Sequence, residues 1–240
     1  MIPVVVFDLG KVLVDFDYRI AARKVAARSS RKIAGLDQLL SNSPLLAKFE
    51  SGLLTPRQFF SAVQKVTGFR GDCNEFARYF ADIFSPMPGM VAVHARLRKR
   101  KVPAYIFSNT NAIAVDHIRR RFPFFSDFDG YVLSYEIGAM KPRAKMYQAL
   151  ETLTRRRGDD IFYIDDRAEN IETALARGWR AVLHRSTRTT RAALQAFLDA
   201  HNGDSNFQRG QQRNNKTKAK SLHRTSAQAP SRWVGPFSAG

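Results

Sequence analysis

The sequence is poor in cysteine, with Cys73 alone among 240 residues. One cysteine excludes a disulfide bond within the chain, which favours a reducing compartment. No apolar stretch is long enough to span a membrane, and the apolar run over residues 2–7 ends at Asp8 without a basic segment before it. This pattern is not that of a secretory signal, so we expect a cytoplasmic protein with no membrane partner.

Acidic residues are also scarce, because 21 Asp and Glu stand against 39 Lys and Arg, a net charge of +18. Such a charge attracts phosphorylated ligands and weakly holds nucleic acid. The sequence has no nucleic-acid recognition motif, however, and no aromatic residues interleaved with basic ones to read bases. We expect a small phosphorylated metabolite as partner, and nucleic acid only through weak, non-specific binding by the basic C-terminal tail. The sequence does not determine the oligomeric state.

Three apolar runs predict buried strands, and polar side chains follow each of them. The runs cover residues 2–7, 102–107 and 161–164, and the polar residues are Asp8, then Ser108 and Asn109, then Asp165 and Asp166. Taken singly, each of these residues would also suit a turn. If the strands lie parallel in one sheet, their carboxyl ends meet at one edge, and the polar groups converge on one crevice.

Helical and strand patterns alternate from residue 89 to residue 200, with further strands expected at 131–133 and 180–183. This alternation predicts an α/β fold, a doubly wound parallel sheet with helices on both faces. The segment 134–142 is expected to be a loop, with Pro142 as the first residue of a helix over 143–153. We expect the core to comprise residues 1–16 and 86–200.

Residues 17–85 differ from the core because their apolar residues recur at helical spacing and strand patterns are few. They predict a small helical cap inserted after the first strand, with Thr55 and Pro56 beginning one of its helices. From 201 to 240 the sequence carries seven Lys and Arg against one Asp and little apolar content. Such a segment cannot bury enough surface to fold, so we expect a disordered basic tail.

The converging side chains suit phosphoryl chemistry. Clustered carboxylates repel one another unless a proton or cation lies among them, and Mg²⁺ prefers oxygen ligands of this kind. A carboxylate such as Asp8 can also act as a nucleophile and form an aspartyl-phosphate. Ser108, Asn109 and Lys141 are candidates to bind the phosphoryl oxygens. By spacing alone, Lys141 would be a solvated surface residue.

Four segments together resemble the motifs of the haloacid dehalogenase (HAD) superfamily, in its branch with a helical cap after the first strand. They are, in order, similar to the nucleophile, phosphate-binding, lysine and acidic metal motifs, and they cover residues 7–13, 106–110, 138–142 and 163–171. Residues 49–52 with Phe59 resemble a recurring element of the cap. The resemblance covers about residues 1–200, and four motifs in the same order are far more specific than any one of them.

The resemblance implies a Mg²⁺-dependent phosphatase that hydrolyses a small phosphomonoester through an aspartyl-phosphate. It implies that Asp8 is the nucleophile and binds the metal together with the backbone carbonyl of Gly10. Asp166 would bind the metal directly, with Asp165 close by or bound through water. Ser108 and Asn109 would hold the phosphate, and Lys141 would neutralise the nucleophile and the phosphoryl oxygens.

Gly10 departs from the family pattern, because most phosphatases of the superfamily carry a second aspartate there as general acid and base. Loss of such a group costs about 10²–10⁴-fold in rate when nothing replaces it. The motif resembles that of a branch that includes bacterial α-D-glucose-1-phosphate phosphatase, and a sugar phosphate is therefore one candidate substrate. An anomeric phosphate is a good leaving group that needs less protonation. Asp15 and Asp17 lie nearby in the sequence as substitutes.

Two alternatives stay open. The first is a 2-haloacid dehalogenase-type hydrolase, which works without metal; these enzymes tend to carry a tyrosine at the position of Gly10 and lack the paired acids. The second is a non-catalytic protein of the same fold with a nucleic-acid-binding basic tail. Asp165 and Asp166 favour a Mg²⁺ site and therefore a phosphatase.

Overall fold

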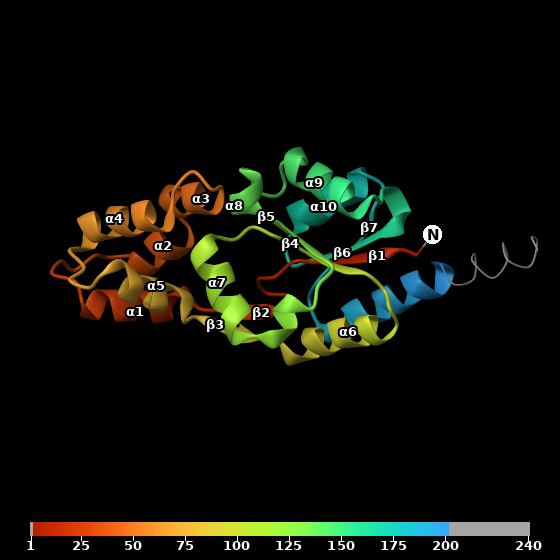
Figure 1. Cartoon of the computed structure of the whole chain (residues 1–240), viewed down its shortest axis with the longest axis horizontal. Coiled ribbons are helices and arrows are strands. Elements are labelled where there is room, and N and C mark those ends of the chain that lie inside the picture. Colours follow the sequence, from red (N-terminus) through yellow and green to blue (C-terminus); the bar gives the residue numbers. More distant parts are fainter. Residues whose placement is uncertain (1, 202–240) are drawn as a thin grey trace, which may run out of the picture. The chain divides into compact units, whose positions relative to one another are not determined.

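A five-stranded parallel sheet forms the centre of the molecule (Figure 1). The computed structural model describes residues 2–201, and in it the strands lie in the order β5 (Gly130–Leu133), β4 (Ala104–Ser108), β1 (Val4–Phe7), β6 (Ile161–Asp165) and β7 (Arg180–Leu183). Every neighbouring pair is parallel. The strands predicted from the apolar runs are therefore confirmed, and β1, which carries the first motif, lies in the middle.

Helices cover both faces of the sheet, which confirms the doubly wound α/β fold. Figure 1 shows α9 (Ala144–Thr154) and α10 (Ala168–Ala176) on one side and α6 (Pro88–Lys99) on the other. Met146 and Leu150 of α9 pack in a buried apolar cluster with Val4 and Val6 of β1. The remaining core helices are α7 (Ala112–Arg121) and a helix over residues 187–201.

The segment before α9 differs from the predicted loop. Residues Ser134–Ile137 form a short helix, α8, and Gly138 then takes a left-handed conformation with φ 71°. Pro142 precedes α9 instead of beginning it, since the helix starts at Ala144. The reason is tertiary: the backbone of Lys141 is bound to the side chain of Asn109 at the end of β4, so the helix begins only after this attachment.

Five helices lie between β1 and α6 in the sequence and build most of a second apolar cluster, to which Ile113 of α7 also belongs. These cap helices are α1 (Tyr18–Ala27), α2 (Leu36–Ser41), α3 (Pro44–Glu50), α4 (Pro56–Thr67) and α5 (Cys73–Ala81). Their centre is aromatic, with the rings of Phe49 and Phe59 stacked at 4.5 Å. Thr55 caps α4 and Pro56 begins it, as predicted. The boundaries of a separate cap domain at residues 17 and 85 stay a prediction.

A two-stranded antiparallel ribbon joins the cap helices to the core and was not predicted. It pairs β2 (Val14–Phe16) with β3 (Phe84–Pro86), in the register Phe16 to Phe84. Strands of three residues are too short to show an alternating pattern. The two strands are also far apart in the sequence, so only the folded chain reveals their pairing.

The chain divides after Phe197 into two units, and only residues 198–201 of the second are described. The predicted disordered tail over 201–240 therefore lies outside the described residues, apart from His201. Among residues 2–201, no helix has both the length and the apolar character needed to cross a membrane.

Candidate active site

Three carboxylates meet where β1 and β6 end side by side. The strands pair in register from Val4 with Ile161 to Phe7 with Ile164, so the residues that follow, Asp8 and Asp165, are neighbours. Oxygen atoms of Asp8, Asp165 and Asp166 lie within 4.8 Å of one another. Asp8 and Asp165 are buried and Asp166 is partly buried. The structure thus brings together the acids that the sequence predicted to converge.

Lys141 reaches this cluster from the segment between α8 and α9. Its Nζ lies 3.0 Å from Oδ1 of Asp8 and 2.7 Å from Oδ2 of Asp165, and its residue exposure is only 5%. It also donates a hydrogen bond of 2.8 Å to the carbonyl of Phe107 in β4. The ammonium group is therefore a buried counter-charge to two carboxylates, and spacing in the sequence alone would have placed it in solvent.

Hydrogen-bond donors surround Asp165 on all sides. It accepts from Lys141 Nζ, from the hydroxyl of Tyr163, from the backbone N–H of Arg167 at 2.8 Å, and from Asn170 Nδ2 at 3.1 Å. Burial opposes the charge of Asp165, but Lys141 and these donors hold its pKa below the ordinary value. Asp165 is therefore a fixed anion that orients Lys141.

Asp8 has fewer donors, and its electrostatics differ accordingly. Its Oδ1 accepts from the N–H of Leu9 at 2.7 Å and faces Lys141. Burial raises the pKa of Asp8 to about 7, with Asp165 and Asp166 adding to the rise and Lys141 opposing it. Burial and the charge of Asp165 likewise raise the pKa of Asp166. The cluster holds more negative charge than Lys141 alone compensates, which is a setting that favours a cation.

Burial disfavours the charged form of Lys141, but the nearby carboxylates of Asp8 and Asp165 raise its pKa above the ordinary value. Lys141 is therefore a permanent cation at this edge of the sheet. A cationic donor held between two acids suits the binding of an anionic group that approaches Asp8.

Ser108 is the last residue of β4 and Asn109 follows it, at the same edge of the sheet. Ser108 is buried, and its hydroxyl donates to the carbonyl of Asn109 at 3.3 Å. The Asn109 amide accepts from the backbone N–H of Lys141 at 2.7 Å and donates to its carbonyl at 3.0 Å. Asn109 therefore positions the backbone of Lys141. These two bonds leave the second Nδ2 hydrogen and the backbone N–H of Asn109 as donors for a ligand.

The side-chain space at Gly10 is occupied by the ring of Phe16. A Cβ at this position would lie 2.9 Å from Cε1 of Phe16, so an aspartate would require that ring to move. The suggested substitutes do not join the cluster either. Asp15 pairs with Lys11 and its side chain is 57% exposed, while Asp17 caps α1 and pairs with Arg19. The usual second acid therefore has no equivalent along the segment 10–17.

The donor set of the cluster fits a hard divalent cation. The ligand atoms that the cluster offers are all oxygens, from the carboxylates of Asp8, Asp165 and Asp166. Mg²⁺ takes such oxygen ligands, whereas histidine or cysteine ligands, which favour zinc, are absent from this described cluster. The excess negative charge described above gives the physical reason for a cation there.

Glu50 is a charged residue near this edge that was not predicted as part of the site, although residues 49–52 had been noted as a recurring element. It ends α3 of the cap helices and is partly buried. Burial raises its pKa to about 7; the charge of Arg167 opposes the rise and that of Asp8 adds to it. The charges of Glu50 and Asp8 therefore interact, which makes Glu50 a candidate neighbour of the cluster.

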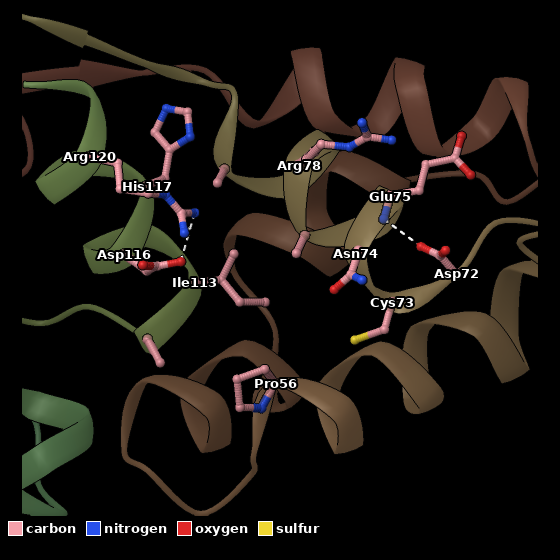
Figure 2. A pocket seen from close by; sticks show the side chains of 13 residues that line it. Pro56, Asp72, Cys73, Asn74, Glu75, Arg78, Ile113, Asp116, His117 and Arg120 are labelled. Atoms are coloured by element: carbon pink, nitrogen blue, oxygen red, sulfur yellow. Dashed lines mark hydrogen bonds and ion pairs between the residues drawn. The ribbon is translucent and has the colours of Figure 1, made fainter.

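A cleft of about 670 Å³ lies elsewhere, between α5 and α7 (Figure 2). Figure 2 shows Cys73 and Asn74 of α5 on one side, and Asp116 and Arg120 of α7 on the other. Arg120 is paired with Asp116 at 2.7 Å. None of the predicted site residues lines this cleft. The chemistry expected from the motifs therefore belongs to the sheet edge and not to this cavity.

The parallel sheet, the inserted helices and the acidic edge define a class of hydrolase. A family model of haloacid dehalogenase-like hydrolases matches residues 2–178, which is most of the chain. The chain therefore belongs to this family of hydrolases, as the four motifs had suggested.

Individual relatives refine this picture. A pyrimidine 5'-nucleotidase of Escherichia coli strain K12 is 28% identical over 156 residues, which cover 60% of this chain and 69% of that protein. A HAD family enzyme of Bacteroides thetaiotaomicron, solved with magnesium and inorganic phosphate, has a TM-score of 0.67 at 22% identity, covering 76% of this chain and 93% of that one. An L-2-haloacid dehalogenase of Xanthobacter autotrophicus has a TM-score of 0.55 at 16% identity, covering 75% and 76%. The two structures share the fold with this chain.

Proposed function

We propose that this hydrolase is a Mg²⁺-dependent phosphatase that cleaves a small phosphomonoester through an aspartyl-phosphate. The observation that carries the proposal is the cluster of Asp8, Asp165 and Asp166 within 4.8 Å, with Lys141 Nζ against two of the three. Paired acids beside the first aspartate suit a metal site. The magnesium and phosphate bound by the Bacteroides enzyme and the phosphomonoester substrates of a nucleotidase support the same reading.

In this proposal, Asp8 attacks the phosphorus and the ester oxygen leaves; water then attacks the aspartyl-phosphate and restores Asp8. Lys141 holds the phosphoryl oxygens and keeps Asp8 ionised, and Ser108 and Asn109 donate further hydrogen bonds. Asp8, the carbonyl of Gly10 and Asp166 would hold Mg²⁺, which supplies positive charge to the phosphoryl group. Asp165 is saturated with donors, which supports a place beside the ion and not on it.

The substrate belongs to the same proposal. Resemblance to the α-D-glucose-1-phosphate phosphatase branch favours a sugar phosphate, and the nucleotidase relative makes a nucleoside monophosphate the natural comparison. Residues 17–85 would act as a cap that selects the leaving group. Because the segment 10–17 offers no acid to the cluster, a leaving oxygen that needs protonation would have to take its proton from another element, whereas an anomeric phosphate needs little protonation.

The test is phosphate release from a panel that contains α-D-glucose 1-phosphate, other sugar phosphates and pyrimidine nucleoside 5'-monophosphates. Each substrate is assayed with Mg²⁺ and again after EDTA, and Asp8→Asn serves as the inactive control. We expect release that needs metal and disappears in the variant. No release from a folded protein would overturn the proposal, and chloride release from a 2-chloroacid without metal would put the dehalogenase reading in its place.

A further inference from the structure

The proposed phosphatase lacks a group to move protons at the position where its family usually carries one. At Gly10 the ring of Phe16 fills the side-chain space, with 2.9 Å to a Cβ built there. Asp15 and Asp17 are bound to Lys11 and to the start of α1. A general acid and base, if the protein has one, must therefore come from another element.

Glu50 at the end of α3 is held against the core by backbone contacts. Its carbonyl accepts a hydrogen bond of 2.6 Å from the hydroxyl of Ser134, the first residue of α8. The same hydroxyl accepts a hydrogen bond of 2.9 Å from the N–H of Thr110, two residues after Ser108. One buried side chain thus links the end of α3 to the predicted phosphate loop, and Figure 1 shows α3 beside α8.

Gly52 completes this attachment two residues later. Its φ is 71°, and a Cβ there would lie 2.2 Å from the carbonyl oxygen of Tyr135 in α8. Such a close approach requires glycine. The turn 50–52 therefore rests directly on α8, and the backbone of Glu50 is fixed beside the segment that Ser134 links to Thr110.

The charges around Glu50 suit a group that gains and loses a proton. The groups whose charges interact with Glu50 include Asp8 at the end of β1 and Arg167 after β6, and the charge of Glu50 in turn raises the pKa of Tyr18 in α1. Asp8 and burial favour its protonated form, and Arg167 favours the anion. Its pKa of about 7 lies near neutral pH, where a general acid and base works best.

The geometry of phosphoryl transfer places the leaving oxygen on this side. Attacking and leaving oxygens lie roughly in line across phosphorus, so a phosphoryl group attacked by Asp8 presents its leaving oxygen away from the sheet edge. Figure 1 shows the cap helices on the side toward which β1 runs from the N-terminus. Glu50 belongs to these helices, and its charge interacts with that of Asp8.

We propose that Glu50 acts as the general acid and base of this site, in place of the missing second aspartate; this rests on the proposed phosphatase function. When Asp8 attacks phosphorus, the bond to the leaving oxygen breaks and that oxygen takes the proton of the Glu50 carboxylic acid. Water then attacks the aspartyl-phosphate, and the Glu50 carboxylate takes its proton. Inorganic phosphate leaves, and both carboxyl groups return to their first state.

The experiment compares Glu50→Gln with the wild type on p-nitrophenyl phosphate, whose leaving group needs little protonation, and on glycerol 2-phosphate, whose leaving group needs it. For the variant we expect kcat/KM on glycerol 2-phosphate to fall by about 10²–10⁴-fold, while kcat/KM on the aryl ester changes far less. The limb of the pH profile that requires protonated Glu50 should disappear. With the aryl ester, a burst of nitrophenol followed by slow turnover should reveal accumulated aspartyl-phosphate.

Glu136→Gln is the matched control, since it changes an exposed carboxylate of α8 to an amide and should leave both esters unaffected. Glu50→Asp keeps the carboxyl group and should recover part of the alkyl-ester rate. An equal loss of kcat/KM on both esters with an unchanged pH profile, or no loss at all, would overturn the role of Glu50 alone. Absence of phosphate release by the wild type from these two esters and from every member of the substrate panel would overturn the phosphatase function and this role together.

Discussion

At the residue scale, one buried cation compensates part of the charge of a cluster of three acids. Lys141 lies between Asp8 and Asp165, and the donors around Asp165 leave that residue a permanent anion. Asp8, with fewer donors, carries the less favourable charge. The same arrangement that makes the cluster costly to bury makes it attractive to a cation and to a phosphoryl group.

Removing the Lys141 ammonium group should make the burial of these carboxylates measurable as a loss of stability. We expect Lys141→Ala to abolish turnover and to lower the free energy of unfolding by about 3–5 kcal/mol, because two buried carboxylates lose their partner. Urea unfolding at pH 8 and at pH 5 measures the free energy of unfolding of the variant and of the wild type. The difference between them should be smaller at pH 5, where the carboxylates that have lost Lys141 take up protons. Lys145→Ala, an exposed lysine of α9, is the control. A stability change no larger than that of the control would contradict the buried pairing.

Asp166 is the acid assigned to direct metal contact. We expect Asp166→Asn to weaken Mg²⁺ binding by about 10-fold or more and to abolish turnover, since the charge is lost while the shape is kept. Isothermal titration with Mg²⁺ gives the affinity independently of activity. Glu172→Gln, an exposed residue of α10, should bind Mg²⁺ like the wild type. Unchanged affinity in Asp166→Asn would remove this residue from the proposed ligands.

Glu50 should also shape the stability of the metal-free protein. Its pKa is raised from 4.5 to about 7 in the folded state, so the folded protein binds more protons than the unfolded one between these values. Stability attributable to Glu50 is therefore lost as pH rises from about 4.5 to about 7. We expect the Tm of Glu50→Gln to lie above that of the wild type at pH 8, by about 2–4 °C for each kcal/mol gained in the free energy of unfolding. The difference in Tm should shrink as the pH is lowered to 4.5. Glu136→Gln should show no such pH-dependent difference.

At the scale of elements, the contact of α3 with α8 is one of those that hold the cap helices on the core, beside the β2–β3 ribbon and the contact of α5 with α7. Ser134 and Gly52 make this contact, one by a hydrogen bond and the other by the absence of a side chain. The turn 50–52 is thereby tied to the same core segment that leads to Lys141. Proper placement of α3 is then a condition for activity and not only for stability.

Gly52→Ala tests this contact directly. The new Cβ would lie 2.2 Å from the Tyr135 carbonyl, so we expect a loss of kcat/KM of about 10-fold or more as α3 moves away from α8. Gly35→Ala is a matched control, because Gly35 has nearly the same φ, 69°, and no atom nearer than 3.9 Å to the added Cβ. Both variants carry the cost of positive φ, about 1 kcal/mol, in thermal unfolding. Equal activity in the two would refute the importance of the contact.

At the scale of the whole molecule, the chain carries a net charge of +18, whereas its candidate site is acidic. Basic residues attract phosphorylated ligands from solution, while the three acids of the cluster oppose a second anion unless a cation compensates them. The basic residues of the chain thus act on a ligand that is still in solution, whereas the acids of the cluster act on the bound ligand.

Added salt should weaken the long-range attraction of the ligand and leave the buried contacts of the site almost unchanged. We expect KM for a sugar phosphate to rise with NaCl between about 0.05 and 0.5 M, because the Debye length falls below the distance over which surface charges act. The buried contacts of Lys141 are little screened, so kcat should stay nearly constant. An equal ionic strength series with Mg²⁺ held saturating controls for metal binding. A KM that is independent of salt would show that the surface charge does not assist binding.

The sequence by itself determined the local parts of this protein. Apolar runs of four to six residues were enough to identify β1, β4 and β6, and the Thr55-Pro56 pair identified the start of α4, because these signals lie within a few neighbouring residues. Polar residues at strand ends likewise located the acids, since parallel strands deliver their carboxyl ends to one edge.

Only the tertiary structure decided what depends on residues far apart in the chain. It buried Lys141 beside acids that lie 133 and 24 positions away, paired β2 with β3, and filled the side-chain space of Gly10 with Phe16. It also tied Glu50 to Ser134, 84 positions later. Burial and electrostatic environment arise from the summed surroundings of a group, and those surroundings come from many segments at once, so no local pattern in the sequence contains them.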